Sequence, residues 1–172
     1  MLTARQKEMV AVFEKHVRAE VDGDLDTTMA TMTDAPHLHN VPTMIGGVGH
    51  DGVRSFYHDR LVGKFFPPDM TMERVSLTVG DDQLVEELVI RFTHTKEIEW
   101  MLPHVPPTGK RVVTAFVVIV GVKDDKVSHE HIYWDQASVL AQLGIIDPSG
   151  LPIVGAESAE RVLNPHLPPR AY

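Results

Sequence analysis

Four apolar, β-branched segments follow one another through the middle of the sequence, and they constrain the fold more than any other feature. They cover residues 70–80, 83–100, 111–122 and 126–134, and short polar turns such as GDDQ and KDDK separate neighbouring segments. Alternation of apolar and polar residues is typical of strands with one buried face. Because short turns join antiparallel neighbours, the sequence predicts successive antiparallel strands.

Helical patterns stand on both sides of these strands. The spacing of Met9, Phe13 and Val17 predicts an amphipathic helix, and Thr3 with Gln6 offers a capping box at its start. Further segments are assigned as follows: a short helix over Leu25, Met29 and Met32, a strand over 37–41, a glycine-rich loop over 44–52, a helix over 53–62, a helix from 136 that Gly144 would end, and one or two helical turns around Ala156 to Leu163.

Helices that are segregated from a run of antiparallel strands predict an α+β fold, with the helices covering one face of a curved sheet. Such a sheet can close into a cone whose concave side forms a ligand cavity. A length of 172 residues with 43% hydrophobic content fits one globular domain. We assign residues 1–147 to this domain and 148–172 to a C-terminal extension, whose apolar residues would pack on the same domain or on a dimer partner.

Composition excludes several classes of function. Sixteen Lys and Arg against 24 Asp and Glu give a net charge of -8 without a basic block, which argues against nucleic-acid binding. The chain has no cysteine, so disulfides and thiolate nucleophiles are excluded. No stretch of 18 apolar residues and no signal-peptide pattern occurs, so we expect a cytoplasmic protein without membrane contact.

Three stretches resemble, in order and spacing, the SnoaL-like polyketide cyclase branch of the NTF2-like superfamily. They are GGVGHDGVRSFY (46–57), FTHT (92–95) followed by PPTGKRV (106–112), and DDKVSHEHIYWDQASVLAQLGIID (124–147). The tail also looks like the cyclase-like domains found beside some dienelactone hydrolases. The resemblance implies a cone-shaped α+β barrel, usually dimeric, with an apolar internal pocket.

Function transfers less directly within this superfamily, because one fold hosts isomerases, hydrolases, cyclases, dehydratases and binding domains. We expect a cofactor-independent acid/base enzyme of the cyclase, isomerase or dehydratase type, acting on a small apolar carbonyl or lactone compound. The alternative is a non-catalytic small-ligand-binding or accessory domain. Both interpretations include a homodimer, and neither needs a cofactor or a metal.

Asp135 is the first candidate catalytic residue. The resemblance places it where cyclases of this branch carry a general acid/base carboxylate at the end of the last strand. An Asp among apolar walls loses hydration, which raises its pKa and suits it for proton transfer at neutral pH. The alternative is a helix N-cap, because Asp135 stands directly before the helical pattern of residues 136–143.

A base needs donors that stabilise the developing negative charge, and His39, His131 and Tyr133 are the candidates. Period-2 geometry places His131 and Tyr133 on one strand face together with His129 and Asp135. For Tyr133 a packing role is the alternative, and for His39 a solvent-facing edge position. Where relatives often have Glu-Glu-Arg, this sequence has His129-Glu130-His131.

Six further residues are candidates for ligand contact. They are His37, Phe56, Tyr57, Arg91, His94 and His129. Phe56 and Tyr57 would form a lid or simply pack in the core, and Arg91 would seek a carboxylate on a neighbouring strand. His129 and His131, joined by His39 or Asp135, also have the residue types of a two-His-one-carboxylate metal site, but this short pattern occurs often by chance.

Overall fold

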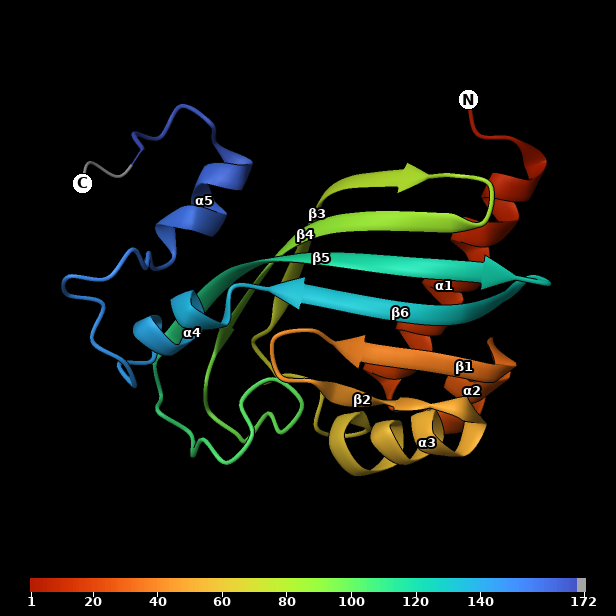
Figure 1. Ribbon diagram of the computed structural model, residues 1–172, viewed down its shortest axis with the longest axis horizontal. Coiled ribbons are helices and arrows are strands. Elements are labelled where there is room, and N and C mark those ends of the chain that lie inside the picture. Colours follow the sequence, from red (N-terminus) through yellow and green to blue (C-terminus); the bar gives the residue numbers. More distant parts are fainter. Residues whose placement is uncertain (170–172) are drawn as a thin grey trace.

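The computed structural model describes residues 1–169 and contains one sheet of six strands (Figure 1). The strands are β1 (Met32–Asn40), β2 (Ile45–Val48), β3 (Thr71–Val79), β4 (Gln83–Thr93), β5 (Arg111–Lys123) and β6 (Lys126–Trp134). They stand in the order β2-β1-β6-β5-β4-β3. All neighbours are antiparallel except β1 and β6, which run parallel and bring the first strand beside the last.

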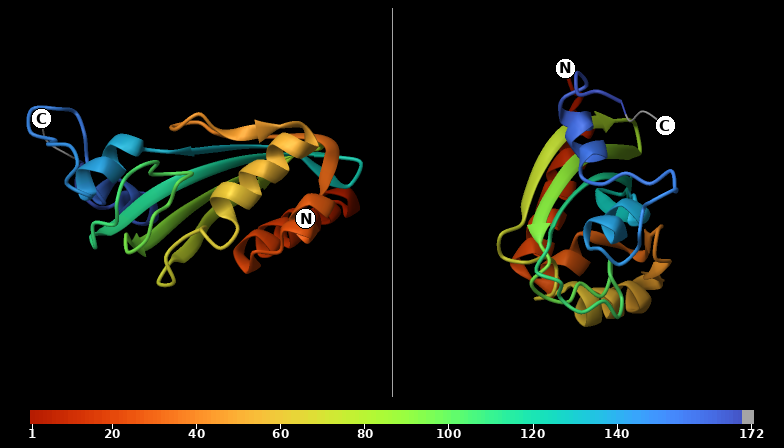
Figure 2. Two further views of the ribbon diagram at one scale, coloured as in Figure 1. Left: turned by 90° about the horizontal axis from the view of Figure 1, so that it is seen from below. Right: turned by 90° about the vertical axis from the view of Figure 1, so that its left-hand side faces the viewer.

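Helices cover the concave face of the curved sheet. They are α1 (Ala4–Asp22), α2 (Leu25–Ala30), α3 (Gly49–Phe56) and the π-helical turn η1 (Tyr57–Leu61), while α4 (Gln136–Gln142) and α5 (Glu157–Leu163) follow the last strand. Figure 2 shows α1 (red) and α3 (yellow) on one side of the sheet. The C-terminal helices (blue) lie at the end of the sheet away from the N-terminus. This α+β arrangement confirms the predicted fold class.

The first helix begins and ends where local chemistry requires. Thr3 and Gln6 form the predicted capping box, and Gly23 ends the helix with a φ of 72°. The buried face of α1 carries two polar side chains in addition to its apolar ones; its members are Met9, Phe13, His16, Ala19 and Glu20. This face therefore brings ionisable groups into the core between α1 and the sheet.

The C-terminal segment packs on the outer face of the same sheet. Ala159 of α5 is fully buried against Val89 of β4 and Val113 of β5. Burial of these side chains removes apolar surface from water and holds the tail beside the strands.

Several sequence-based boundaries differ from the structure, and one of them is the start of the helix predicted over 53–62, which begins at Gly49 as α3. Met32 belongs to β1 rather than to the second helix, and residues 45–48 of the expected loop form the edge strand β2. Gly46 permits this strand, because a Cβ there would lie 1.9 Å from the carbonyl oxygen of Leu38. The predicted strand over 83–100 ends at Thr93, after which Trp100 lies in a buried turn.

Within the described residues, no helix has the length and apolar content needed to cross a membrane.

Candidate active site

A cavity of about 70 Å³, partly open to solvent, lies between α1 and the concave face of the sheet. Most of its lining is apolar and aromatic, with Phe13 and Val17 from α1 and Ile132 from β6. Three carboxylates line it too, namely those of Glu20, Glu86 and Glu130. Since ionisable groups are expensive to bury without partners, their neighbours decide what the cavity can do.

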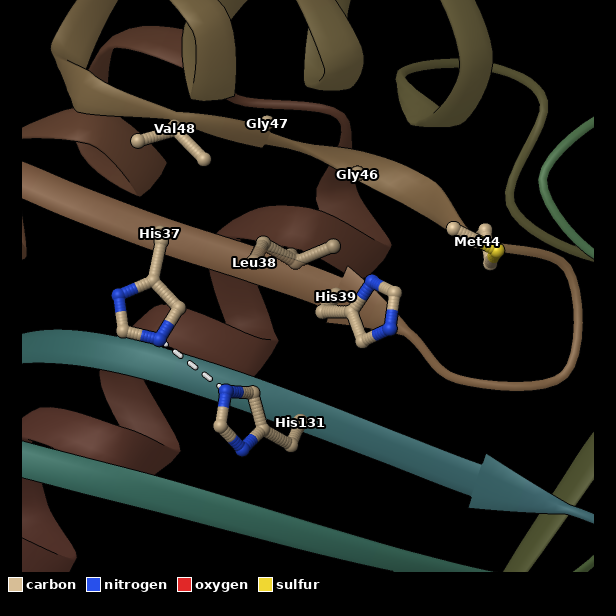
Figure 3. Close-up of a pocket in the computed structure, with 8 residues that line it drawn as sticks. All are labelled: His37, Leu38, His39, Met44, Gly46, Gly47, Val48 and His131. Atoms are coloured by element: carbon tan, nitrogen blue, oxygen red, sulfur yellow. Dashed lines mark hydrogen bonds between the residues drawn. The ribbon is translucent and has the colours of Figure 1, made fainter.

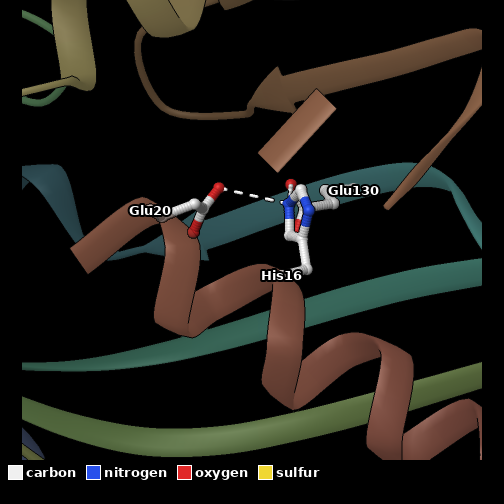
Figure 4. Close-up of side chains that lie close together, drawn as sticks. All are labelled: His16, Glu20 and Glu130. Atoms are coloured by element: carbon white, nitrogen blue, oxygen red, sulfur yellow. Dashed lines mark hydrogen bonds and ion pairs between the residues drawn. The ribbon is translucent and has the colours of Figure 1, made fainter. Parts of the chain in front are cut away.

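His16 lies between two of these carboxylates (Figure 4). Its Nε2 atom is 3.3 Å from Oε1 of Glu20 on the same helix and 3.4 Å from Oε2 of Glu130 on β6. The three residues are buried, with His16 at 0%, Glu130 at 2% and Glu20 at 8% exposure. The Tyr57 hydroxyl from η1 donates to Oε2 of Glu130 at 2.9 Å. We call these four residues the interior cluster.

Hydrogen bonding defines the protonation of His16. Thr31 donates its one hydroxyl proton to the carbonyl oxygen of Thr28 at 2.6 Å, so Nδ1 of His16 must donate to Thr31 Oγ1, 2.7 Å away. The Nε2 atom faces two carboxylates and the Tyr57 oxygen, which lies 3.1 Å away and has given its own proton to Glu130. A donor at Nε2 suits these three acceptors, so the hydrogen bonds favour an imidazolium at His16.

The charges of the cluster move its pKa values in different directions. Burial disfavours the imidazolium of His16, but attraction to Glu130 and Glu20 outweighs it and raises the pKa of His16 to about 10. Burial also acts on Glu130, yet the charge and hydrogen bond of His16 hold the pKa of Glu130 below its ordinary value. Burial and the charge of Glu130 raise the pKa of Glu20. Burial, together with both carboxylates, raises the pKa of Tyr57 well above its ordinary value.

These shifts give the two carboxylates different roles. Glu130, whose pKa is lowered, stays ionised beside His16, while the raised pKa of Glu20 makes its carboxylate the stronger base of the two. Two carboxyl groups whose environments separate their pKa values are a common arrangement for acid/base chemistry. The interior cluster can therefore accept and return a proton at the wall of an apolar cavity.

A surface hollow of about 250 Å³ adjoins the cavity between α1 and strands β3 and β4. The two spaces share five lining residues: Phe13, Val17, Met72, Glu86 and Leu88. Arg74 borders the hollow and pairs with Glu86 and, at 3.4 Å, with Glu14. The hollow therefore extends the cavity along α1 towards the surface.

The interior cluster could also hold a metal ion. The ligand atoms of His16, Glu20 and Glu130 lie within 4.8 Å of one another. Binding would require His16 to lose its Nε2 proton, whose pKa the same carboxylates raise. The ion pairs therefore favour a protonated His16 over a metal-bound one.

The expected position of Asp135 inside the cavity is not what the structure shows. Asp135 is exposed, and its Oδ1 accepts a hydrogen bond from the backbone N–H of Ser138 at 3.0 Å. It is the N-cap of α4, which was the alternative interpretation. Its carboxylate does not line the cavity.

The predicted histidines lie together, but on the outer face of the sheet. Parallel pairing of β1 with β6 sets His37 opposite His129 and His39 opposite His131. Figure 3 shows His37, His39 and His131 around one surface hollow. Tyr133 is on the same outer face and 39% exposed. Period 2 grouped these residues correctly, but that face points away from the cavity.

The remaining candidates have mixed positions. Tyr57 belongs to the interior cluster, and Phe56 is buried in the main core without lining the cavity. Arg91 donates to Glu73 on the neighbouring strand β3 at 2.9 Å. The sequence predicts a carboxylate partner for Arg91 on a neighbouring strand. Nδ1 of His94 accepts from the backbone N–H of Thr108 at 3.3 Å, so this buried histidine braces the 94–109 loop.

Sequence reasoning missed His16, Glu20 and Glu130. A signal was present, because residues 9, 13, 16 and 20 follow one helical stripe, so His16 and Glu20 interrupt an apolar face. Glu130 alternates with His129 and His131 and therefore shares its face with Ile132 and Trp134. Glu130, a charged residue on the apolar face of this strand, therefore indicated the site better than the several polar residues on the opposite face.

A curved sheet that packs helices over a carboxylate-lined apolar cavity defines an α+β domain of the NTF2-like kind. The family model for SnoaL-like polyketide cyclases matches residues 11–143, so the chain belongs to that family. No curated protein matches the sequence.

Solved structures with low sequence identity share this fold. A candidate SnoaL-like polyketide cyclase from Jannaschia sp. CCS1 has a TM-score of 0.66 at 16% identity, covering 86% of this chain and 99% of that one. IdmH, a candidate polyketide cyclase from Streptomyces antibioticus, has a TM-score of 0.60 at 22% identity, covering 79% of this chain and 98% of that one. An NTF2-like protein from Burkholderia xenovorans LB400 has a TM-score of 0.58 at 12% identity, covering 80% of this chain and 97% of that one.

Proposed function

We propose that this protein is a cofactor-independent acid/base enzyme of the cyclase, isomerase or dehydratase type, acting on a small apolar carbonyl compound or lactone. The observation that supports it most is the pair Glu20 and Glu130 at the wall of an apolar cavity, with His16 between them. Membership of the SnoaL-like family agrees with this reaction class.

In the proposed reaction, Glu20 is the general base. Its raised pKa brings its proton affinity nearer to that of a carbon acid, so it accepts a proton from the carbon beside the carbonyl and later returns one. The ionised pair of Glu130 and His16 holds Glu20 in place, and the imidazolium supplies positive charge that offsets the developing enolate. Apolar walls keep water from competing for the proton.

A second candidate function has its own support in the size of the cavity. Its volume of about 70 Å³ is below the roughly 300 Å³ at which ligand pockets usually begin. The adjoining hollow has about 250 Å³ and shares five lining residues with the cavity. A cavity too small for a substrate favours an accessory or small-ligand-binding domain in which the interior cluster only stabilises the fold.

Proton exchange separates the two functions without knowledge of the natural substrate. Small cyclic ketones are incubated with the protein in D₂O, and loss of their α-proton signals is followed by NMR. We expect exchange above the buffer rate for the wild type and a decrease of about 10²- to 10⁴-fold for Glu20→Gln. Glu8→Gln is the matched control, because Glu8 is an exposed residue of the same helix that lines neither the cavity nor the hollow. Exchange at the buffer rate for every ketone supports the second candidate.

The homodimer stays a prediction. Light scattering of the untagged protein should give a mass of twice 19.2 kDa at micromolar concentration.

A further inference from the structure

Four histidines gather on the outer face of the sheet, away from the interior cluster. They are His37 and His39 on β1 and His129 and His131 on β6. All four are partly exposed. Because β1 and β6 are parallel and in register, the imidazoles form a compact group that neither strand could build alone.

Two of these rings already stand close to the spacing of ligands on one metal ion (Figure 3). Nε2 of His37 is 3.1 Å from Nε2 of His131, and the ring centroids are 5.2 Å apart. Metal–nitrogen bonds of about 2.0–2.1 Å in a tetrahedral site place two nitrogen ligands roughly 3.3 Å apart and their rings roughly 5 Å apart. The two nitrogens now share a hydrogen bond, so both rings would have to turn for their lone pairs to meet at one ion.

His39 is the third histidine of this hollow, and its ring would have to turn towards the other two to supply a third nitrogen. It lines the same hollow of about 480 Å³ as His37 and His131, and its ring centroid is 6.4 Å from that of His131. The lining contains no carboxylate, as its full membership shows: His37, Leu38, His39, Met44, Gly46, Gly47, Val48 and His131. Imidazole ligands without carboxylates suit late transition ions rather than Mg²⁺ or Ca²⁺.

His129 holds the group in position. Its ring stacks on His37 with centroids 4.9 Å apart and planes 5° from parallel. The ring also covers Gly121 of β5, where a Cβ would lie 2.1 Å from Cε1 of His129. Gly121 therefore leaves the space that the stacked pair occupies.

We propose that His37, His39 and His131 form a binding site for a divalent late transition ion such as Zn²⁺ or Ni²⁺, with His129 as a positioning residue. Of His37 and His131, the ring that now donates from Nε2 would shift its proton to Nδ1, so that both Nε2 lone pairs bind the ion. Water would complete the coordination, since the hollow is open to solvent. This site does not depend on the proposed enzymatic function.

Calorimetric titration of the untagged protein with ZnCl₂ tests the site. We expect one ion per chain, and at least about a 10-fold weaker affinity for His37→Ala and for His131→Ala. His129→Phe keeps a stacking ring without a ligand atom, so it should bind within a few-fold of wild type. Circular dichroism and thermal unfolding verify that each variant is folded.

Three control variants locate the ion. His50→Ala and His58→Ala remove exposed histidines that lie beside aspartates elsewhere on the surface, and both should leave zinc affinity unchanged. Glu130→Gln alters the interior cluster and should also leave it unchanged. Unchanged affinity in a His37→Ala/His131→Ala double variant, or loss of binding only in Glu130→Gln, would overturn the proposal. With Cu²⁺ as the probe, electron paramagnetic resonance should show coupling to several imidazole nitrogens in wild type and to fewer in His131→Ala.

Discussion

Glu20 on α1 and Glu130 on β6 share a single imidazolium, because Nε2 of His16 lies 3.3 Å from one carboxylate and 3.4 Å from the other. The two acidic side chains come from opposite ends of the domain sequence and both line the cavity. One positive charge cannot neutralise two buried carboxylates fully, so one of them must have a raised pKa. This relationship links the stability of the core to its proposed chemistry.

Tyr57→Phe removes the hydroxyl that donates to Glu130 at 2.9 Å. The carboxylate then lacks one buried hydrogen bond, and we expect a loss of about 1–3 kcal/mol in the free energy of unfolding. Urea denaturation measures this change. Tyr133→Phe is the matched control, because Tyr133 is 39% exposed, and its stability should change by no more than about 0.5 kcal/mol. Equal effects of the two substitutions would contradict the role of the Tyr57 hydroxyl.

The raised pKa of His16 predicts a specific pH dependence. Since the folded-state value of about 10 lies above the ordinary 6.5, the folded protein holds a proton that the unfolded chain releases between these values. The contribution is complete below pH 6.5, and the free energy of unfolding should fall as pH rises from 6.5 towards 10. Urea denaturation across this range measures the slope.

NMR titration of the imidazole provides a direct control on that interpretation. In wild type, His16 should stay protonated well above neutral pH, and in Glu130→Gln its pKa should fall because its largest favourable partner is lost. His58, which is exposed beside Asp59, is the internal reference in both samples. A neutral His16 at pH 7 in the wild type would refute the charge assignment.

Substitutions of Asp135 distinguish capping from catalysis. Asn is as good an N-cap as Asp, so Asp135→Asn should preserve stability within a few tenths of a kcal/mol, whereas Asp135→Ala should lose about 1 kcal/mol. If Glu20 is the base, Asp135→Asn also retains the ketone exchange activity. Loss of exchange in Asp135→Asn with stability intact would return the catalytic role to Asp135.

Gly46→Ala tests the close approach of β2 to β1. Its Cβ would lie 1.9 Å from the carbonyl oxygen of Leu38, so the strands must separate, and we expect a destabilisation of about 1–3 kcal/mol. Gly52→Ala in α3 is the matched control, since its Cβ would lie at an ordinary 3.8 Å from the backbone of Gly47. Ala also favours the helix there by roughly 0.5–1 kcal/mol. The midpoint temperature of thermal unfolding should therefore fall for Gly46→Ala and rise for Gly52→Ala.

Local chemistry determined much of the fold. The alternation of β-branched residues fixed the strands from residue 71 to 134, and Thr3 with Gln6 fixed the start of α1, because these signals act between residues a few positions apart. The same alternation grouped His129, His131 and Tyr133 on one face. The resemblance to SnoaL-like cyclases then indicated the family, which the family model confirms.

Only the tertiary structure decided which face of that strand lies inside. A period of two groups residues without saying which group faces the helices, and α1 packs on the side of Glu130 rather than on the side of the histidines. Likewise, the parallel pairing of β1 with β6 joins segments about ninety positions apart, such as His37 and His129, and no local pattern encodes that pairing. The inner and outer clusters both arise from long-range packing, because burial of apolar surface favours the whole arrangement rather than any one segment.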